Sequence, residues 1–227
     1  MKKVAIFDID GTIFRSSLLI ELVNILIEKK VFPAKARIGF EKEYLNWLDR
    51  QGDYQDYIMA VVGVFIKYIK GVQQDKLTDA IELVNKQHKY RVYRYTRNLT
   101  KMLKESGYYL LAISHSPKLV IDGFGKSLGF DKIYGIRYEV DKKKKFTGEI
   151  MDRDLIFDKS KILLRAVEKE GLTLKDSVGV GDTESDISFL SMVETPICFN
   201  PNSLLYKEAQ KKGWKVVVER KDVIYEL

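Results

Sequence analysis

Cysteine and long apolar runs are both scarce in this 227-residue chain. The one cysteine, Cys198, excludes an intramolecular disulfide and predicts a reducing compartment. The longest apolar run, Ile58 to Ile66, is interrupted by Gly63, whereas a membrane-spanning helix needs about 20 apolar residues. Behind Met1–Lys3, the apolar run covers only Val4 to Phe7, well short of the roughly 7–15 residues of a signal peptide. We therefore expect a cytoplasmic protein that does not insert into a membrane.

The chain also has no internal repeat, and most of its lysines are dispersed. Its net charge of +7 favours anionic ligands. The one lysine run, Lys142 to Lys145, lies between two segments with the pattern of short strands, Tyr138–Val140 and Phe146–Ile150. We interpret it as the solvated tip of a hairpin. A nucleic-acid patch would need interleaved aromatic residues or a basic helix, so no nucleic-acid partner is expected.

The first apolar run ends in two carboxylates. Val4 to Phe7 predicts a short buried strand, and Asp8 and Asp10 follow it directly. In open α/β sheets, ligands bind beyond the carboxyl ends of the strands. A carboxylate at that place can attack phosphorus, so Asp8 is the candidate nucleophile, and Asp10 is the candidate general acid and base. Gly11 permits a sharp exit from the strand, and Thr12 can cap the segment that follows.

Two later apolar runs also end in polar residues. Tyr109 to Ile113 ends at Ser114, whose hydroxyl can donate to a phosphate oxygen beside a helix start. Ser177 to Gly181 ends at Asp182, and Asp186 follows in the next turn. Acidic residues at neighbouring strand ends can hold a hard cation such as Mg²⁺. The three runs together indicate phosphoryl transfer through an aspartate.

Four features follow one another along the chain: the Asp-x-Asp-Gly-Thr segment, the strand ending in Ser114, a lysine at a helix start and the Gly-Asp pair at Asp182. In this order they resemble the motifs of the haloacid dehalogenase-like hydrolase superfamily. The chain is most similar to its phosphoserine phosphatase-type branch, and the resemblance covers nearly the whole chain. It implies Mg²⁺ as cofactor, held by the carboxylates of Asp8 and Asp182 and by the backbone carbonyl of Asp10. It implies that Asp186 orients a ligand or water, and that the substrate is a small phosphorylated molecule.

The same resemblance implies a lysine that neutralises the transferring phosphoryl group. Lys159 and Lys161 both fit its position. We favour Lys161, because a Lys-x-x-Leu pattern leads from it into the amphipathic segment. His115, beside Ser114, is interpreted as an ordinary loop histidine, since the family's chemistry does not need a histidine there.

The periodicity divides the chain into two parts. Residues 15–94 carry four helical patterns and no strand, which predicts an inserted α-helical subdomain; the resemblance identifies it as a C1-type cap. Residues 1–14 and 95–227 alternate between strand and helix. That alternation predicts an α/β fold, with a Rossmann-like parallel sheet and helices on both faces.

The cap region departs from phosphoserine phosphatases at both positions that grip the amino acid. Ser17 occupies the place of their glutamate, with Glu21 one helical turn further on, and the segment from Asp56 to Ile69 contains no arginine. Phosphoserine is therefore disfavoured as substrate. Our leading hypothesis is a Mg²⁺-dependent phosphomonoester hydrolase that forms an aspartyl-phosphate. A phosphotransferase or phosphomutase on the same fold, and a non-catalytic phospho-ligand-binding module, stay open, as do the substrate and the oligomeric state.

Overall fold

A computed structural model describes all 227 residues, and the chain divides into two compact units. The first, here called the core unit, consists of Met1–Ser16, Tyr90–Ile136 and Asp152–Leu227. The second, here called the helical unit, consists of Ser17–Lys89 and Arg137–Met151. The sequence pattern predicted boundaries at residues 14/15 and 94/95 and the hairpin in the α/β part, whereas the two units divide at 16/17 and 89/90, and Arg137–Met151 belongs to the helical unit.

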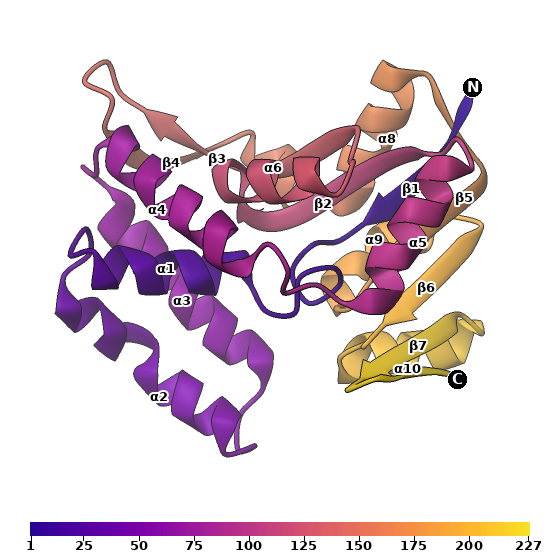
Figure 1. The fold of residues 1–227 in the computed structure, drawn as a ribbon, viewed down its shortest axis with the longest axis horizontal. Helices are drawn as coiled ribbons and strands as arrows, with labels where there is room; N and C mark the ends of the chain where they lie inside the picture. The colour runs from indigo at the N-terminus through magenta and orange to yellow at the C-terminus, as the bar shows by residue number, and fades with distance from the viewer. The chain divides into compact units, whose positions relative to one another are not determined.

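The core unit is built on a mainly parallel sheet (Figure 1). Its strands follow the order β3-β2-β1-β5-β6-β7-β8, and only β7 and β8 are antiparallel neighbours. Their bounds are β1 Lys2–Phe7, β2 Tyr109–Pro117, β3 Lys132–Val140, β5 Leu172–Gly181, β6 Thr195–Phe199, β7 Lys215–Arg220 and β8 Val223–Glu226. This sheet confirms the predicted Rossmann-like α/β class. The sequence pattern did not predict β8. This short strand pairs with one neighbour, β7.

Helices surround this sheet. Their bounds are α5 Arg94–Glu105, α6 Lys118–Ser127, α7 Arg153–Ile156, α8 Lys159–Glu170, α9 Ile187–Leu190 and α10 Ser203–Lys212, with a 3₁₀ turn η2 at Glu184–Asp186. α5 and α6 pack against β2, α8 and α9 against β5, and α10 against β6 and β7. None of the helices in the protein is both long enough and apolar enough to cross a lipid bilayer.

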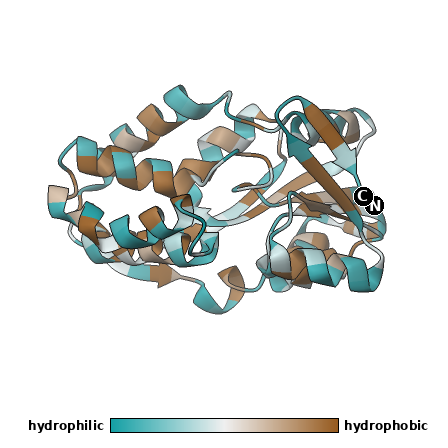
Figure 2. Ribbon diagram, turned by 90° about the horizontal axis from the view of Figure 1, so that it is seen from below, coloured by the Kyte–Doolittle hydropathy of each residue, from teal (hydrophilic) through white to brown (hydrophobic).

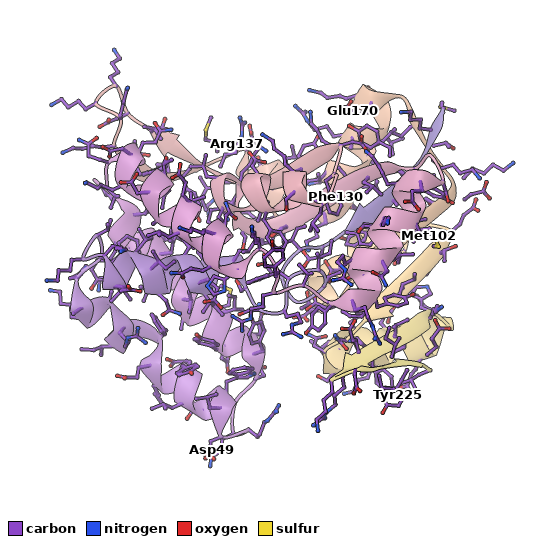
Figure 3. All side chains as sticks on the ribbon, viewed as in Figure 1. Asp49, Met102, Phe130, Arg137, Glu170 and Tyr225 are labelled. Carbon is purple, nitrogen blue, oxygen red and sulfur yellow. The ribbon has the colours of Figure 1, made fainter.

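The centre of the sheet is fully apolar. Every residue from Val4 to Phe7 is buried, as an interior parallel strand requires because both its faces are covered. The ring of Phe7 packs edge to face against Phe130, which Figure 3 labels, with 5.8 Å between the ring centroids. Several strands in Figure 2 are mainly hydrophobic, whereas hydrophobic and polar residues alternate along the helices. The core thus fixes β1, whose end carries the first motif.

The helical unit contains the four predicted helices. They are α1 Leu18–Glu28, α2 Ile38–Leu48, α3 Tyr54–Ile69 and α4 Gln74–His88, with a 3₁₀ turn η1 at Ala34–Arg37. The second half of β3 pairs there with the antiparallel strand β4, Phe146–Met151, so the predicted hairpin is present. The backbone of Phe146 exchanges hydrogen bonds with Gly71 and Val72 in the α3–α4 connection, which fastens the hairpin to the helices.

Two segments at the edge of the core unit pair where the chain leaves it and returns. The Arg15 N–H donates to the carbonyl of Arg91 at 3.0 Å, and the Tyr93 N–H donates to the carbonyl of Ile13 at 2.9 Å. Phe14 and Val92 form an isolated bridge between these two hydrogen bonds. The loop that follows Asp10 is therefore held against a second segment rather than left loose.

Candidate active site

Three neighbouring parallel strands bring the polar residues of the motifs together. β1 lies between β2 and β5, so the carboxyl ends of all three strands meet at one edge of the sheet. Asp8, which follows β1, is buried, and its N–H donates to the carbonyl of Val180 at 3.0 Å. Ser114 lies near the end of β2, and Asp182 directly follows β5. The topology therefore brings Asp8, Ser114 and Asp182 to the same edge of the sheet.

The turn after Asp10 depends on a glycine. Gly11 has a φ of +79°, and an ideal Cβ placed on it would lie 2.0 Å from Asp182 Oδ2. The Thr12 hydroxyl donates to Asp182 Oδ1 at 2.9 Å. The Asp182 carboxylate therefore packs directly against this turn. It occupies the space that the Cβ of any other residue at position 11 would fill.

A buried ammonium group joins two of the carboxylates. Lys159 Nζ lies 2.7 Å from Asp8 Oδ1 and 2.5 Å from Asp186 Oδ1. Its side chain is 2 % exposed, and that of Asp186 is fully buried. The second oxygen of Asp186 accepts hydrogen bonds from the N–H groups of Asp182 and Thr183, at 2.9 and 3.0 Å. Asp186 thus holds both the lysine and the backbone that carries Asp182.

Lys161, the lysine favoured from the sequence, does not reach this cluster. Its side chain is 60 % exposed, and its ammonium lies 3.8 Å from Asp158 at the helix start. Asp158 is the N-cap of α8, so Lys159 is the first helical residue. Two residues further along a helix correspond to a turn of about 200°, which directs Lys161 to the opposite face. The choice of Lys161 is therefore corrected: the lysine beside the aspartates is Lys159.

Ser114 is bonded to Asp10. Its buried hydroxyl donates to Asp10 Oδ2 at 2.8 Å, and it accepts a hydrogen bond from the N–H of Ser116 at 2.9 Å. Asp10 follows β1 along the chain, but its carboxylate is thus oriented by a residue of the neighbouring strand β2. This bond fixes which oxygen of Asp10 is turned toward Ser114.

Burial governs the electrostatics of the cluster. It raises the pKa of Asp8 to about 8; the Lys159 ammonium opposes this rise, while the charges of Asp186 and Asp10 add to it. Burial also raises the pKa of Asp182, and the charges of Asp8 and Asp186 raise it further. For Lys159, burial lowers the pKa, but Asp186 and Asp8 outweigh burial and the net direction is upward. The site thus has more buried negative charge than one ammonium neutralises.

Comparison with known proteins identifies a family. A sequence profile described as haloacid dehalogenase-like hydrolase matches residues 5–191, a range that includes all the residues of the cluster. The chain belongs to the haloacid dehalogenase-like hydrolase family. The predicted resemblance to this family is thereby confirmed.

Individual members of the haloacid dehalogenase-like family are similar at low identity. The phosphoserine phosphatase SerB1 of Mycobacterium tuberculosis is 23% identical, over 93% of this chain and 69% of the relative. A histidinol-phosphatase of Neisseria meningitidis is 24% identical, over 96% of this chain and 99% of the relative. A solved structure described as a phospho-aspartyl intermediate analogue of phosphoserine phosphatase has a TM-score of 0.63 at 22% identity, covering 97% of this chain and 95% of the other. The last of these shows the shared fold.

The haloacid dehalogenase-like family generally uses Mg²⁺, and the residues of this chain fit that ion. Asp8 is buried and Asp182 is half-buried, the charge of Asp8 raises the pKa of Asp182, and a divalent cation would relieve the repulsion between the two carboxylates. No three His, Cys, Asp or Glu side chains form a metal site by themselves. A site of two carboxylates needs further oxygen atoms from backbone and water, which is a usual arrangement for Mg²⁺.

Two residues of this haloacid dehalogenase-like site were not predicted from the sequence in the roles they have. Thr12 was expected only as a cap, and it instead holds Asp182. Lys159 was set aside in favour of Lys161. A signal for Lys159 was available, because Asp158 is a residue type that favours the N-cap and accepts hydrogen bonds from the N–H groups of Ser160 and Lys161. A helix that begins at Lys159 directs that side chain and Lys161 to different faces.

Proposed function

We propose that this hydrolase is a Mg²⁺-dependent phosphomonoesterase that acts on a small phosphorylated metabolite through an aspartyl-phosphate on Asp8. The observation that carries the proposal is the buried lysine held between Asp8 and Asp186. A lysine in contact with a nucleophilic carboxylate can also contact the anionic group which that carboxylate attacks. The names of the relatives, a phosphoserine phosphatase and a histidinol-phosphatase, support a phosphorylated substrate.

In the first half of the proposed reaction, a carboxylate oxygen of Asp8 attacks the phosphorus atom. The bond between phosphorus and the alcohol oxygen breaks, and Asp10 transfers its proton to that oxygen. Ser114, which donates to Asp10 Oδ2, keeps the carboxyl oriented for this transfer. The products of this half are a free alcohol and phosphorylated Asp8.

In the second half, Asp10 acts as the base. It takes a proton from water, whose oxygen attacks the phosphorus, and the bond between phosphorus and Asp8 breaks. Inorganic phosphate leaves, and Asp8 and Asp10 return to their starting states. The ammonium of Lys159 offsets negative charge on the phosphoryl group in both halves. When bound, Mg²⁺ would be held by Asp8 and Asp182 and would offset the repulsion between an anionic nucleophile and an anionic substrate.

We further propose that the helical unit acts as the cap that selects the leaving group. The unit lacks the expected clamp for an amino acid: α3 contains no arginine, and Ser17 is buried at the start of α1. Glu21, one turn further along α1, already has a partner within the helical unit, because its Oε2 lies 3.5 Å from Nε2 of His88 on α4. These features favour a substrate other than phosphoserine.

The test is hydrolysis of p-nitrophenyl phosphate by the full chain, with Mg²⁺ and after its removal by a chelator. We expect activity that needs Mg²⁺ and falls to background in Asp8→Asn, with Asp49→Asn, at an exposed position that Figure 3 labels, as the matched control. Near-wild-type turnover by Asp8→Asn would exclude the proposed mechanism. Inactivity of the wild type on a broad panel of phosphomonoesters would instead favour a phospho-ligand-binding module.

A second readout separates hydrolysis from transfer. The amount of inorganic phosphate released should equal the amount of alcohol formed, at every concentration of added alcohol acceptors. A phosphotransferase or phosphomutase would release less phosphate than alcohol when an acceptor is present. Phosphorylation of the acceptor would therefore contradict the hydrolase and support the alternative.

A further inference from the structure

Helices α2 and α3 pack against each other and leave an open groove between them (Figure 1). Two depressions of about 560 and 430 Å³ make up this groove, and they are continuous because Gly39 and Ala60 line both of them. Every residue that lines the groove belongs to the helical unit. Two large apolar side chains lie in it and face solvent: Ile38 is 72 % exposed and Met59 is 54 % exposed.

The two glycines of the groove differ in what they do for the fold. An ideal Cβ on Gly39 would lie 2.5 Å from Val64 Cγ2, so Gly39 allows α2 to lie close to α3. An ideal Cβ on Gly63 would meet nothing within 4 Å, although glycine is the least favourable residue after proline inside a helix such as α3. No contact of the chain with itself therefore explains Gly63. Its missing side chain leaves the groove open to a second body that approaches the backbone closely.

The two ends of the groove carry opposite charges. The larger depression is lined by two lysines, Lys35 and Lys67, and by no acidic residue, so its net charge is +2. The smaller one is lined by one lysine and three carboxylates, so its net charge is −2; these residues are Lys42, Glu43, Asp53 and Asp56. None of the six side chains takes part in an ion pair within the chain. Both ends thus keep their charge for an outside partner.

A second copy of the chain matches both ends at once. A two-fold axis through the middle of the groove, near Gly39 and Ala60, would place the basic end of each copy against the acidic end of the other. A charge of +2 then meets a charge of −2 twice, whereas a partner of a single charge sign would match only one end.

We propose that the chain forms a symmetric homodimer through this groove. The contact would cover the exposed side chains of Ile38 and Met59, and the open surface at Gly63 would receive side chains of the second copy. This interaction surface lies apart from the aspartate cluster, because all its residues come from the helical unit and the cluster belongs to the core unit. It does not depend on the proposed phosphatase function, and its tests need no activity.

The first test is sedimentation equilibrium of the full chain from about 1 to 100 µM. We expect a species of twice the mass of one chain that gains population with concentration. Because salt screens exposed charges, its dissociation constant should rise between about 0.05 and 0.5 M NaCl. A monomer at every concentration would overturn the proposal, and the groove would then be left to another partner.

Charge reversal tests how the two copies are arranged. Lys35→Glu with Lys67→Glu gives both ends a charge of −2, and Glu43→Lys with Asp56→Lys gives both ends a charge of +2. Each double variant alone should be monomeric, because ends of like charge would meet. An equimolar mixture of the two should form a heterodimer, with a dissociation constant within about tenfold of the wild-type value, because opposite charges again meet at both ends.

The matched control for the first double variant is Lys169→Glu with Lys211→Glu. Both lysines are exposed in the core unit, and the pair makes the same change in net charge, so the dimer should persist. A mixture that stays monomeric would overturn the proposed arrangement. Dimers of both reversed variants at wild-type strength would overturn it equally.

Gly63→Gln tests the open surface of the groove. Glutamine is a good helix former, so the thermal unfolding midpoint should rise by roughly 2–3 °C, measured at a concentration where the wild type is monomeric. Its side chain enters the groove, so the dimer dissociation constant should rise by at least about tenfold. Gly63→Ala should share the stabilisation and weaken the dimer less. A stabilised Gly63→Gln that dimerises like the wild type would show that no second copy approaches Gly63, and the proposal would fail.

Discussion

Lys159 donates a hydrogen bond to Asp8 across 2.7 Å, and both side chains are buried. Replacing this lysine removes the one cation that directly contacts the candidate nucleophile. We expect Lys159→Met to lower kcat/KM for p-nitrophenyl phosphate by roughly 10²–10³-fold, the usual scale for one electrostatic stabiliser of a transition state. Lys161→Met is the matched control and should stay within about twofold of the wild type, because its side chain is exposed. A greater loss in Lys161→Met than in Lys159→Met would reverse the assignment.

Asp10→Asn should separate the two halves of the reaction. The amide still accepts the Ser114 hydroxyl but cannot transfer a proton, so we expect kcat to fall by roughly 10²–10⁴-fold. p-Nitrophenolate is a good leaving group that needs little protonation, so the first turnover should survive. Rapid mixing should show a burst of nitrophenol equal to the enzyme concentration, with phosphorylated Asp8 accumulating. A loss of Mg²⁺ binding without a burst would instead make the Asp10 side chain a metal ligand.

Gly11→Ala tests the close approach of Asp182. The added Cβ meets Asp182 Oδ2 at 2.0 Å, whereas a Cβ at Gly107, which has a φ of +82°, meets nothing within 4 Å. Gly107→Ala should therefore show only the backbone cost of a positive φ, about 1–2 kcal/mol in the free energy of unfolding, with activity unchanged. Gly11→Ala should in addition lower kcat/KM by at least about tenfold, because Asp182 must move. Equal activity of the two variants would show that the contact is unimportant.

The neutral state of His115 predicts a pH dependence of stability. Its pKa is lowered from 6.5 to about 4 in the folded protein, so between these values the unfolded chain binds more protons. This contribution is complete above pH 6.5 and is lost as the pH falls toward 4. Between pH 7 and pH 5 it amounts to about 2 kcal/mol. Urea unfolding without Mg²⁺ should therefore show a shallower acid loss for His115→Asn than for the wild type, and parallel curves would contradict the lowered pKa.

The proposed role of the helical unit as the cap predicts a substrate preference. A site built to pair charged groups rejects analogues strongly, whereas an apolar site discriminates weakly. Since α3 has no arginine and Ser17 replaces the expected glutamate, kcat/KM for phosphoserine should be no higher than for several other phosphomonoesters. A panel that includes phosphoserine and histidinol phosphate measures this directly. A clear preference for phosphoserine would show that another residue, such as Glu21, supplies the clamp.

Local sequence was enough to predict the central strands and the polar residues at their ends. The buried run from Val4 to Phe7 has the pattern of one interior strand, and Asp8 follows it whatever the rest of the chain does. Parallel strands joined by helices meet at their carboxyl ends, so the grouping of Asp8, Ser114 and Asp182 also followed from pattern and topology. The helices of the inserted segment were visible in the same way, from apolar residues at helical spacing.

The order of side chains inside the site depended on the tertiary structure. Lys159 and Lys161 are the same residue type, two positions apart, and both fit the position of the expected lysine. The start of α8 after its N-cap, Asp158, decides which of them faces the aspartates. Periodicity could not separate them, because a helix start that moves by one residue turns every side chain by about 100°.

The sequence by itself therefore determined the fold class, the family and which acidic residues gather, since these follow from patterns within single strands and helices. Tertiary structure showed which lysine contacts them, that Thr12 holds Asp182, and that the ring of His115 packs against Phe157, two residues before Lys159. Each of these contacts joins residues from different elements. Its existence depends on the angle and offset between packed elements, and no local pattern in the chain carries that information.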